Sequence, residues 1–295
     1  KLQSNDRIVL LARKYVDTDP IENFFPKSSK RNQANILTDK NSKRKLLILG
    51  WNHKMPALIQ EFDSYETEHF DIDLLSLIPI TQREQHMSRY NSHKKGVTLR
   101  HLEGDYTSPS DLQRINPEQY DNIVFLANSW LASNEESDAR TILGYLILKR
   151  ILPKNFSKPE ILVELMDPEN EKLFQQRTGE VLISPYILSH ILAHVALRRE
   201  LNVVFDELFT VGGAEIYFRP VSFFNFTKTE MNFKEIGECV SEKGEIALGI
   251  RDLSKAMENT GGIYLNPPRN IQFKLNDSIE LVVLTTYLDC KKGNE

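Results

Sequence analysis

Short apolar runs alternate with helical segments between residues 44 and 184, and this alternation constrains the fold more than any other feature. The first run, Leu46–Leu49, is a continuous apolar strand that ends at Gly50. Further apolar runs follow at 70–77, 97–102, 122–127, 161–165 and 181–183. Continuous apolar strands separated by helices are typical of a parallel sheet that helices cover on both faces. We therefore predict an α/β fold, with a Rossmann-like doubly wound parallel sheet over 44–184.

The sequence changes character after residue 184. A long helix is predicted over 185–202, and the remainder, 203–290, mixes strand-like runs with a helix over 232–241. Pairs of glycines and prolines mark turns between these runs, at Gly212-Gly213, Gly261-Gly262 and Pro267-Pro268. This pattern predicts a small α+β domain that follows the long helix, with residues 291–295 as a tail.

The N-terminal part contains one apolar run, Arg7–Ala12, followed by a polar segment over 17–43. Between Lys27 and Lys45 there are seven basic side chains and a single acid. Such a segment is typical of a solvated linker, and the alternative is a basic patch for a membrane or a partner. Residues 1–11 can be laid on 274–284, which is either chance similarity or a sign that 1–16 is the final strand of a preceding copy of the small domain.

Composition excludes several classes of function. The net charge of −4 is unfavourable for a broad grip on nucleic acid, so we expect no nucleic-acid partner. No apolar run approaches the roughly 18 residues of a membrane-spanning helix. Cys239 and Cys290 are too few for a disulfide framework or a cysteine zinc site.

The loop after the first strand reads Gly50-Trp51-Asn52-His53-Lys54-Met55-Pro56. A dinucleotide fingerprint has glycines at the positions that Gly50, Asn52 and Met55 hold here, and only the first is a glycine. The ribose-binding acid expected after the second strand is also missing, because 75–79 contains none. Amides at the start of the next helix can still approach an anion. We therefore expect no required cofactor and rank NAD, ATP or ADP low.

Open α/β sheets bind ligands at the carboxyl ends of their strands, so a ligand site is expected there. Glu164 lies in an apolar strand and would need a partner if it is buried. The candidate ligand-binding residues are Gly50, Trp51, Asn52, His53, Asp105, Asn128 and Glu164.

Two groups of carboxylates could hold a divalent cation, with Ca²⁺ as the candidate. The candidate metal ligands are Asp105, Glu135, Glu136 and Asp138. The alternative, which we favour, is that the last three stabilise the start of a helix. His190 and His194 lie one helical turn apart but lack a third zinc ligand. No nucleophile elbow, phosphate loop or paired-carboxylate motif stands out, so we expect no enzyme.

Several strings together resemble one family of ion channels. They are Leu46–Pro56, Ser137–Thr141, Ile183–Ser189, Glu207–Phe209 and Leu265–Pro268. Each is similar to the corresponding string of the CASTOR/POLLUX family, and the resemblance extends over about 44–286. Pro185 and Gly212-Gly213-Ala214 depart from the family pattern, where acids are usual.

The resemblance implies an RCK (TrkA-N-like) architecture, with a Rossmann N-lobe, a crossover helix and a small C-lobe. Such domains form homo-oligomers through their crossover helices and assemble into a ring beneath a cation pore, which lies in the same full-length chain. The resemblance places the dimer interface at Tyr186, Ile187, Ile191 and Val195. It also implies calcium regulation, without assigning ligands residue by residue.

The hypothesis that follows is a cytosolic regulatory, gating-ring domain of a CASTOR/POLLUX-like cation channel, in which ligand sensing is coupled to pore opening. It would lie on the cytoplasmic side of a membrane, and we expect a bacterial inner membrane. The alternative is a TrkA/KtrA-like peripheral subunit that senses nucleotide in a potassium-uptake system. The permeant ion and the sensed ligand stay open.

Overall fold

The computed structural model describes residues 42–65, 68–89, 96–131, 133–153, 159–174, 181–256, 258 and 260–286. The described chain forms two compact units that divide between Gly213 and Ala214. The predicted strand over 7–12, most of the predicted linker and the tail lie outside the described residues.

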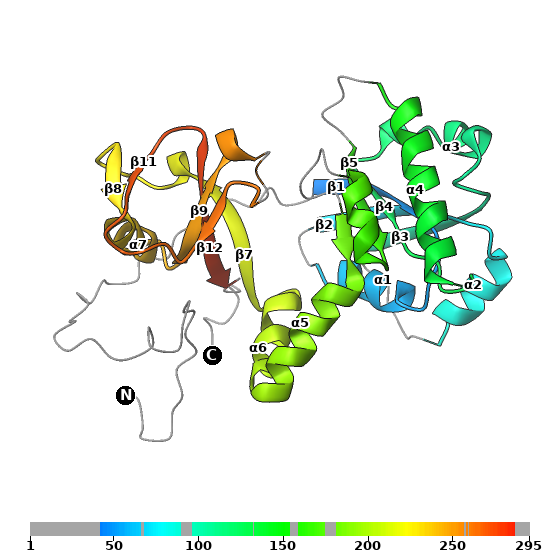
Figure 1. Cartoon of the computed structure of the whole chain (residues 1–295), viewed down its shortest axis with the longest axis horizontal. Coiled ribbons are helices and arrows are strands. Elements are labelled where there is room, and N and C mark those ends of the chain that lie inside the picture. The colour runs from blue at the N-terminus through cyan, green and yellow to red at the C-terminus, as the bar shows by residue number, and fades with distance from the viewer. Residues whose placement is uncertain are drawn as a thin grey trace, which may run out of the picture. The chain divides into compact units, whose positions relative to one another are not determined.

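A six-stranded parallel sheet forms the centre of the first unit (Figure 1). Its strands are β1 (Ser42–Leu49), β2 (Glu68–Ser76), β3 (Val97–Glu103), β4 (Asn122–Phe125), β5 (Glu160–Leu165) and β6 (Val181–Ile183). The spatial order is β3-β2-β1-β4-β5-β6, and every neighbouring pair is parallel. The order therefore reverses between β1 and β4, which confirms the predicted doubly wound α/β fold.

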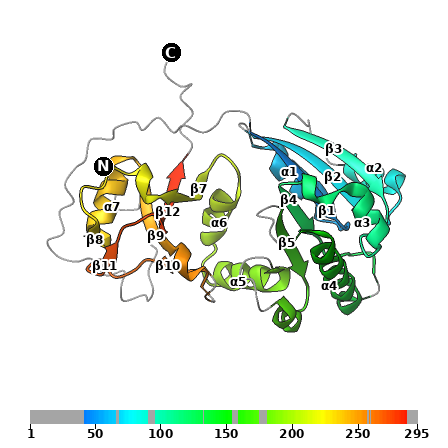
Figure 2. The ribbon, with the colours of Figure 1, turned by 90° about the horizontal axis from the view of Figure 1, so that it is seen from above.

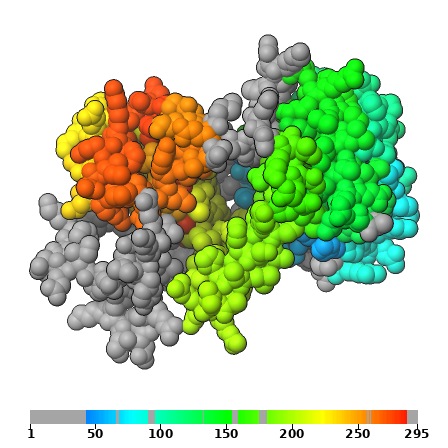
Figure 3. Space-filling model, viewed as in Figure 1, coloured from blue at the N-terminus to red at the C-terminus, as the bar shows by residue number. Residues whose placement is uncertain are grey.

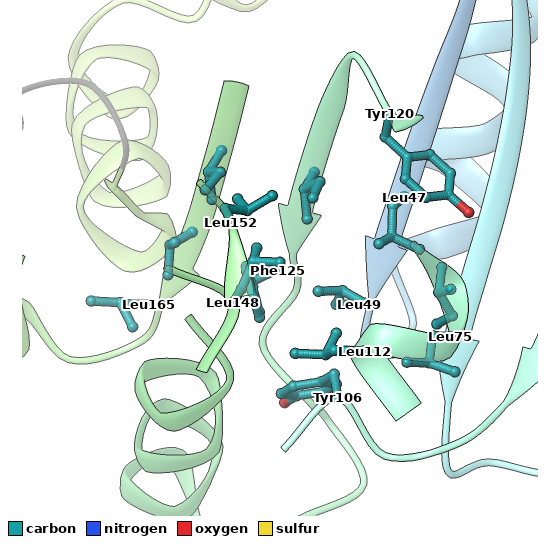
Figure 4. Close-up of a cluster of buried hydrophobic side chains, with 14 of the residues drawn as sticks. Leu47, Leu49, Leu75, Tyr106, Leu112, Tyr120, Phe125, Leu148, Leu152 and Leu165 are labelled. Atoms are coloured by element: carbon teal, nitrogen blue, oxygen red, sulfur yellow. The ribbon is translucent and has the colours of Figure 1, made fainter. Parts of the chain in front are cut away.

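Helices cover both faces of this sheet. One face packs against α1 (Met55–Asp63) and α2 (Ile80–Met87), and the other against α3 (Pro109–Ile115) and α4 (Asn134–Ile151). Figure 2 shows α4 beside β5. Figure 4 shows the second of these two cores, in which Leu49, Phe125 and Leu148 are completely buried. Strands that are apolar on both faces require this double cover.

Two further helices, α5 (Ser184–Leu197) and α6 (Leu201–Phe209), complete the first unit. They contact each other, but neither contains a buried residue. The large apolar side chains exposed on them are Tyr186, Ile187, Leu188, Leu192, Leu197, Val203 and Phe209. The yellow-green surface in Figure 3 is the outer face of this α5–α6 hairpin. Among the described helices, none is both long enough and apolar enough to span a bilayer.

The second unit packs a helix against an antiparallel sheet. The sheet has the order β10-β9-β12-β7, and a separate two-stranded sheet pairs β8 with β11. The strands are β7 (Ala214–Pro220), β8 (Glu230–Asn232), β9 (Ile246–Asp252), β10 (Ile263–Leu265), β11 (Gln272–Lys274) and β12 (Ile279–Thr286). The helix α7 (Phe233–Glu242) buries Phe233, Ile236 and Val240 against this sheet. This is the predicted α+β domain, with β8 and β11 as strands that the sequence pattern does not indicate.

Candidate functional site

The loops that follow β1 and β4 touch at the carboxyl edge of the parallel sheet. Gly50 has φ of +110°, and a Cβ atom there would lie 2.6 Å from the carbonyl oxygen of Leu126. Only glycine allows this close approach, because L side chains rarely adopt such a backbone conformation. The glycine that begins the predicted loop therefore serves to bring the two loops together.

Asn128 fixes the loop after β4 to its surroundings. Its Oδ1 accepts hydrogen bonds from the Trp51 amide and from Trp130 Nε1, both at 3.3 Å. Its Nδ2 donates to the Tyr106 hydroxyl, and its backbone amide donates to Ser137 Oγ at 2.8 Å. Burial of Tyr106 raises the pKa of its phenol, although hydrogen bonds such as the one from Asn128 act in the opposite direction. Asn128 thus uses its amide group for the protein's own contacts.

Asn52 occupies the place where a dinucleotide fingerprint has its second glycine. The side chain is buried, and its Nδ2 donates to the Ala127 carbonyl at 2.8 Å. Its Oδ1 accepts from the Lys54 amide at 2.9 Å. Met55, at the third glycine position, is completely buried in the core beneath α1. The side chains that replace the glycines fill the space beside β1 and β4, as their size predicts.

Glu164 lies at the end of β5 and is buried with its carboxylate fully hydrogen-bonded. The Ala127 amide donates to Oε2 at 3.1 Å, and Asn52 Nδ2 donates to the same atom at 3.4 Å. Oε1 accepts from the Lys54 ammonium and from the Ser184 hydroxyl. A buried carboxylate requires such donors, and the prediction that a buried Glu164 would need a partner is confirmed.

Asp105, after β3, forms a second ion pair at this edge. Its Oδ1 accepts from Arg140 Nη2 at 2.7 Å and from both the amide and the hydroxyl of Thr107, at 2.8 and 2.7 Å. Burial raises the pKa of this carboxyl, but the bonds from Thr107 and Arg140 outweigh burial, so the pKa lies below its usual value. The Arg140 guanidinium also lies over the rings of Tyr106 and Trp130, at 5.7 and 5.9 Å from their centres.

Three of the four candidate metal ligands, Glu135, Glu136 and Asp138, lie at the start of α4, whereas Asp105 follows β3. Asp138 is completely buried and accepts from the Met166 and Asp167 amides and from Asn170 Nδ2, each at 2.9 Å. Glu135 and Glu136 are exposed in the first turn of α4, which Ser133 caps. Within the described ranges, no three His, Cys, Asp or Glu side chains are grouped so that they could hold a metal ion. The places of Glu135 and Glu136 in the first turn fit the helix-stabilising alternative, whereas Asp138 instead fixes the segment after β5. Calcium binding stays a prediction.

The remaining candidate residues are placed as follows. His53 is exposed in the loop after β1, whereas Trp51 is buried with its ring 5.8 Å from that of His86. Of the predicted interface residues, Tyr186 and Ile187 are exposed on α5. The other two, Ile191 and Val195, are half-buried.

Sequence reasoning missed three contributors to this edge. Lys54 and Ser184 both bind Glu164, and neither was singled out. Arg83, in α2, is completely buried and donates to the carbonyls of Leu74 and Leu102 at 3.1 and 3.0 Å. Burial lowers the pKa of this guanidinium. It lies in a helix that is polar in sequence, so no periodicity distinguishes it from the exposed side chains around it.

The comparisons with known proteins agree on one family of channels, although no family model matches the chain. A protein from Oryza sativa subsp. japonica named "Probable ion channel CASTOR" is 23% identical over 280 residues, which cover 83% of this chain. "Probable ion channel POLLUX" from the same plant is 22% identical over 92% of this chain. "Ion channel CASTOR" from Lotus japonicus is 24% identical over 77%. This chain resembles the CASTOR and POLLUX ion channels.

The solved structures support the fold. A structure of the human SLO3 gating ring matches with a TM-score of 0.54 at 14% identity, covering 81% of this chain and 44% of that one. The match shows that this chain has the fold of a gating-ring chain, as the predicted RCK architecture requires. The chain spans only 31%, 31% and 30% of the three CASTOR and POLLUX relatives, so it corresponds to less than a third of each.

Proposed function

We propose that this chain is the regulatory, gating-ring domain of a CASTOR/POLLUX-like cation channel. The similarity to these channels over most of the chain and the fold shared with a gating ring support the proposal. In this proposal the pore belongs to the same full-length protein, and the ring lies on the cytosolic side of the membrane. In this role the domain does not catalyse a reaction. Binding of a ligand to the ring changes the free energy of pore opening, which is a coupling free energy between the two sites.

The observation that carries the proposal is the uncovered apolar surface of the α5–α6 hairpin. Seven large apolar side chains are exposed there, with Leu192 at 59% and Leu197 at 85%. Exposed apolar side chains gathered on one pair of helices support an interaction surface there. A second copy of the same hairpin fits best, because a symmetric interface requires a surface that is complementary to itself. We therefore propose a homo-oligomer that forms through α5 and α6.

The test is the molar mass of the purified chain measured by sedimentation velocity over a range of concentrations. The unchanged chain is expected to associate, and Leu192→Asp is expected to be a monomer because it places a charge inside the apolar contact. Leu173→Asp is the matched control: this leucine is 67% exposed but lies in the 3₁₀ segment Pro168–Phe174, not on α5. Association that survives Leu192→Asp, or that Leu173→Asp abolishes equally, would contradict the proposal.

The sensed ligand is addressed by thermal unfolding with calcium, magnesium, NAD, NADH, ATP and ADP in turn. A ligand at about 100 times its dissociation constant adds roughly 2.7 kcal/mol to the stability of the form that binds it. We expect no stabilisation by the nucleotides, because Asn52 and Met55 fill the space of the fingerprint glycines. Stabilisation by a nucleotide would instead favour the peripheral subunit of a potassium-uptake system.

A further inference from the structure

The Glu164 carboxylate joins two segments that the proposed function needs to couple. Its Oε1 atom accepts from the ammonium of Lys54, in the loop after β1 at the carboxyl edge of the sheet, where the candidate ligand-binding residues lie. The same atom accepts from the hydroxyl of Ser184, the first residue of α5. Lys54 and Ser184 are separated by most of the first unit in sequence, yet one oxygen atom holds both. A change at one donor therefore alters the acceptor of the other.

The two donors differ in how easily they can leave. The Lys54 side chain is 43% exposed, whereas that of Glu164 is only 4% exposed. The ammonium can turn into solvent at the cost of this one contact, but the carboxylate cannot follow it. A buried carboxylate without its counter-charge is costly, so the site must rearrange when the ammonium leaves. The atoms free to respond are those of Ser184 and the first turn of α5.

Few other contacts fix the start of α5. None of its residues is buried, and its N-cap residue, Ile183, provides no side-chain cap. Ser184 follows directly after β6, which pairs with β5 over only three positions, including Glu164 with Leu182. The start of α5 is thus anchored by the buried Ile183 before it and by the hydrogen bond from Ser184 to Glu164.

We propose that the ion pair between Lys54 and Glu164 is the input of a switch whose output is the position of α5. With the ammonium in place, Glu164 holds Ser184 and α5 is fixed. Without it, water that enters to solvate the uncompensated carboxylate competes with the Ser184 hydroxyl for Oε1, and the first turns of α5 loosen. The inference rests on the proposed regulatory function, because it supplies the physical link between the ligand edge and the surface through which the chains associate.

Hydrogen–deuterium exchange of the α5 amides over 188–193 tests the switch, because their acceptors are the carbonyls of the first turns. All variants are made in the Leu192→Asp background, so that self-association does not protect α5. Lys54→Met removes the ammonium and is expected to speed exchange of these amides about tenfold, the effect of losing one charge-assisted contact. Lys54→Arg keeps the cation and is expected to restore the slow exchange.

Two references separate the switch from general loss of structure. Lys43→Met removes an exposed ammonium that pairs with Asp71, on β1 and β2, and should leave exchange in α5 unchanged. The amides of α7, in the second unit, should exchange as in the parent in every variant. If Lys54→Met does not fold, Glu164→Gln provides the same test, because the amide keeps the shape of the side chain without its charge.

A double-mutant cycle completes the design. Lys54→Met is expected to have no further effect on α5 exchange in a Glu164→Gln chain, since the two residues act as a unit. Exchange over 188–193 within about twofold of the parent in both single variants would overturn the proposal. A chain that stays monomeric without the Leu192→Asp change, yet loosens α5 with Lys54→Met, would refute the proposed assembly and leave the switch standing.

Discussion

Helix α7 of the second unit and helix α5 of the first unit differ in burial and in capping. The α7 helix of the second unit buries Phe233, Ile236 and Val240 on one face and begins with a capping box between Asn232 and Glu235. The α5 helix of the first unit has no buried residue and no side-chain cap. One helix is stabilised by its own unit, and the other leaves its apolar residues uncovered. Packing of an apolar face provides most helical stability. This is why we propose that α5 packs against a second copy of the chain.

One ion pair in each unit shows a similar difference in exposure to solvent. Arg219 and Glu245, in the second unit, are only 15% and 3% exposed, and both Arg219 Nε and Nη2 donate to one carboxylate oxygen. The guanidinium also lies 4.8 and 4.7 Å from the ring centres of Tyr217 and Phe223. Asp105 and Arg140, in the first unit, form a pair that is 29% and 24% exposed. The pair of Arg219 and Glu245 is therefore more completely removed from water than the pair of Asp105 and Arg140.

The largest expected effect is that of a charge on the buried face of α7. Ile236→Asp should destabilise the second unit by about 4 kcal/mol or more, because it buries an unpaired carboxylate. At a concentration low enough for the parent to be monomeric, Leu192→Asp on α5 should change the unfolding free energy of the first unit by no more than about 0.5 kcal/mol. Both tryptophans, Trp51 and Trp130, lie in the first unit, so their fluorescence in urea reports that unit alone, while circular dichroism reports both.

The comparison fails if Leu192→Asp lowers the stability of the first unit as much as Ile236→Asp lowers that of the second. In that case α5 would be part of its own unit's core.

The next largest effect concerns the buried pair of the second unit. Arg219→Met should cost about 3–5 kcal/mol, because it leaves Glu245 buried without a counter-charge. The double variant Arg219→Met with Glu245→Leu should recover most of this loss, since two apolar residues of similar volume leave no charge behind. Urea unfolding followed by circular dichroism measures both variants. A double variant as unstable as the single one would show that the aromatic contacts of Arg219, not its charge, provide the stability.

Local patterns were sufficient to predict the parallel sheet and to place three candidate residues at its carboxyl edge. The apolar runs of β1, β4 and β5 are continuous, and the rule that ligands bind at the carboxyl ends of strands then places Gly50, Asn128 and Glu164 together. The short strands β8 and β11, of three residues each, were not predicted. Each has a single apolar residue between polar ones, unlike the equally short apolar run of β6, so their pairing depends on the packing around them.

The partners of Glu164 could not be predicted, for a different reason. Lys54 and Ser184 lie 110 and 20 residues away from it in sequence, and neither has a pattern that distinguishes it from other polar loop residues. The sequence showed only that a buried glutamate must find donors. Which donors it finds is decided by the order of the strands, because β1, β4, β5 and the start of α5 converge only in the folded sheet.

A smaller effect tests the caps that distinguish the two helices. Asn232→Ala should cost about 1 kcal/mol, because the side chain no longer accepts from the Glu235 amide, a bond of 2.9 Å. Asn232→Asp is the matched control, since the carboxylate keeps an acceptor at the same place. The measurement is the urea midpoint of the second unit by circular dichroism. A loss in Asn232→Asp equal to that in Asn232→Ala would show that the cap hydrogen bond is not what stabilises α7.

The smallest expected effect is the pH dependence of the stability that the partly buried ion pair of Asp105 and Arg140 provides. Because the pKa of Asp105 in the folded chain lies below its usual 3.8, the ionised carboxylate stabilises the fold at pH values above 3.8. This contribution is lost as the pH falls through the lowered pKa. Asp105→Asn should therefore be less stable than the parent near neutral pH, and the difference should shrink as the solution becomes more acidic.

Urea unfolding followed by tryptophan fluorescence at a series of pH values measures this difference, with the exposed Glu118→Gln as control. The control should follow the parent at every pH. A difference between Asp105→Asn and the parent that stays constant into acid would mean that packing against Thr107 and Arg140, and not the charge, accounts for the loss. The charge of Asp105 would then contribute little to stability. The contrast with the buried pair of Arg219 and Glu245 would be larger.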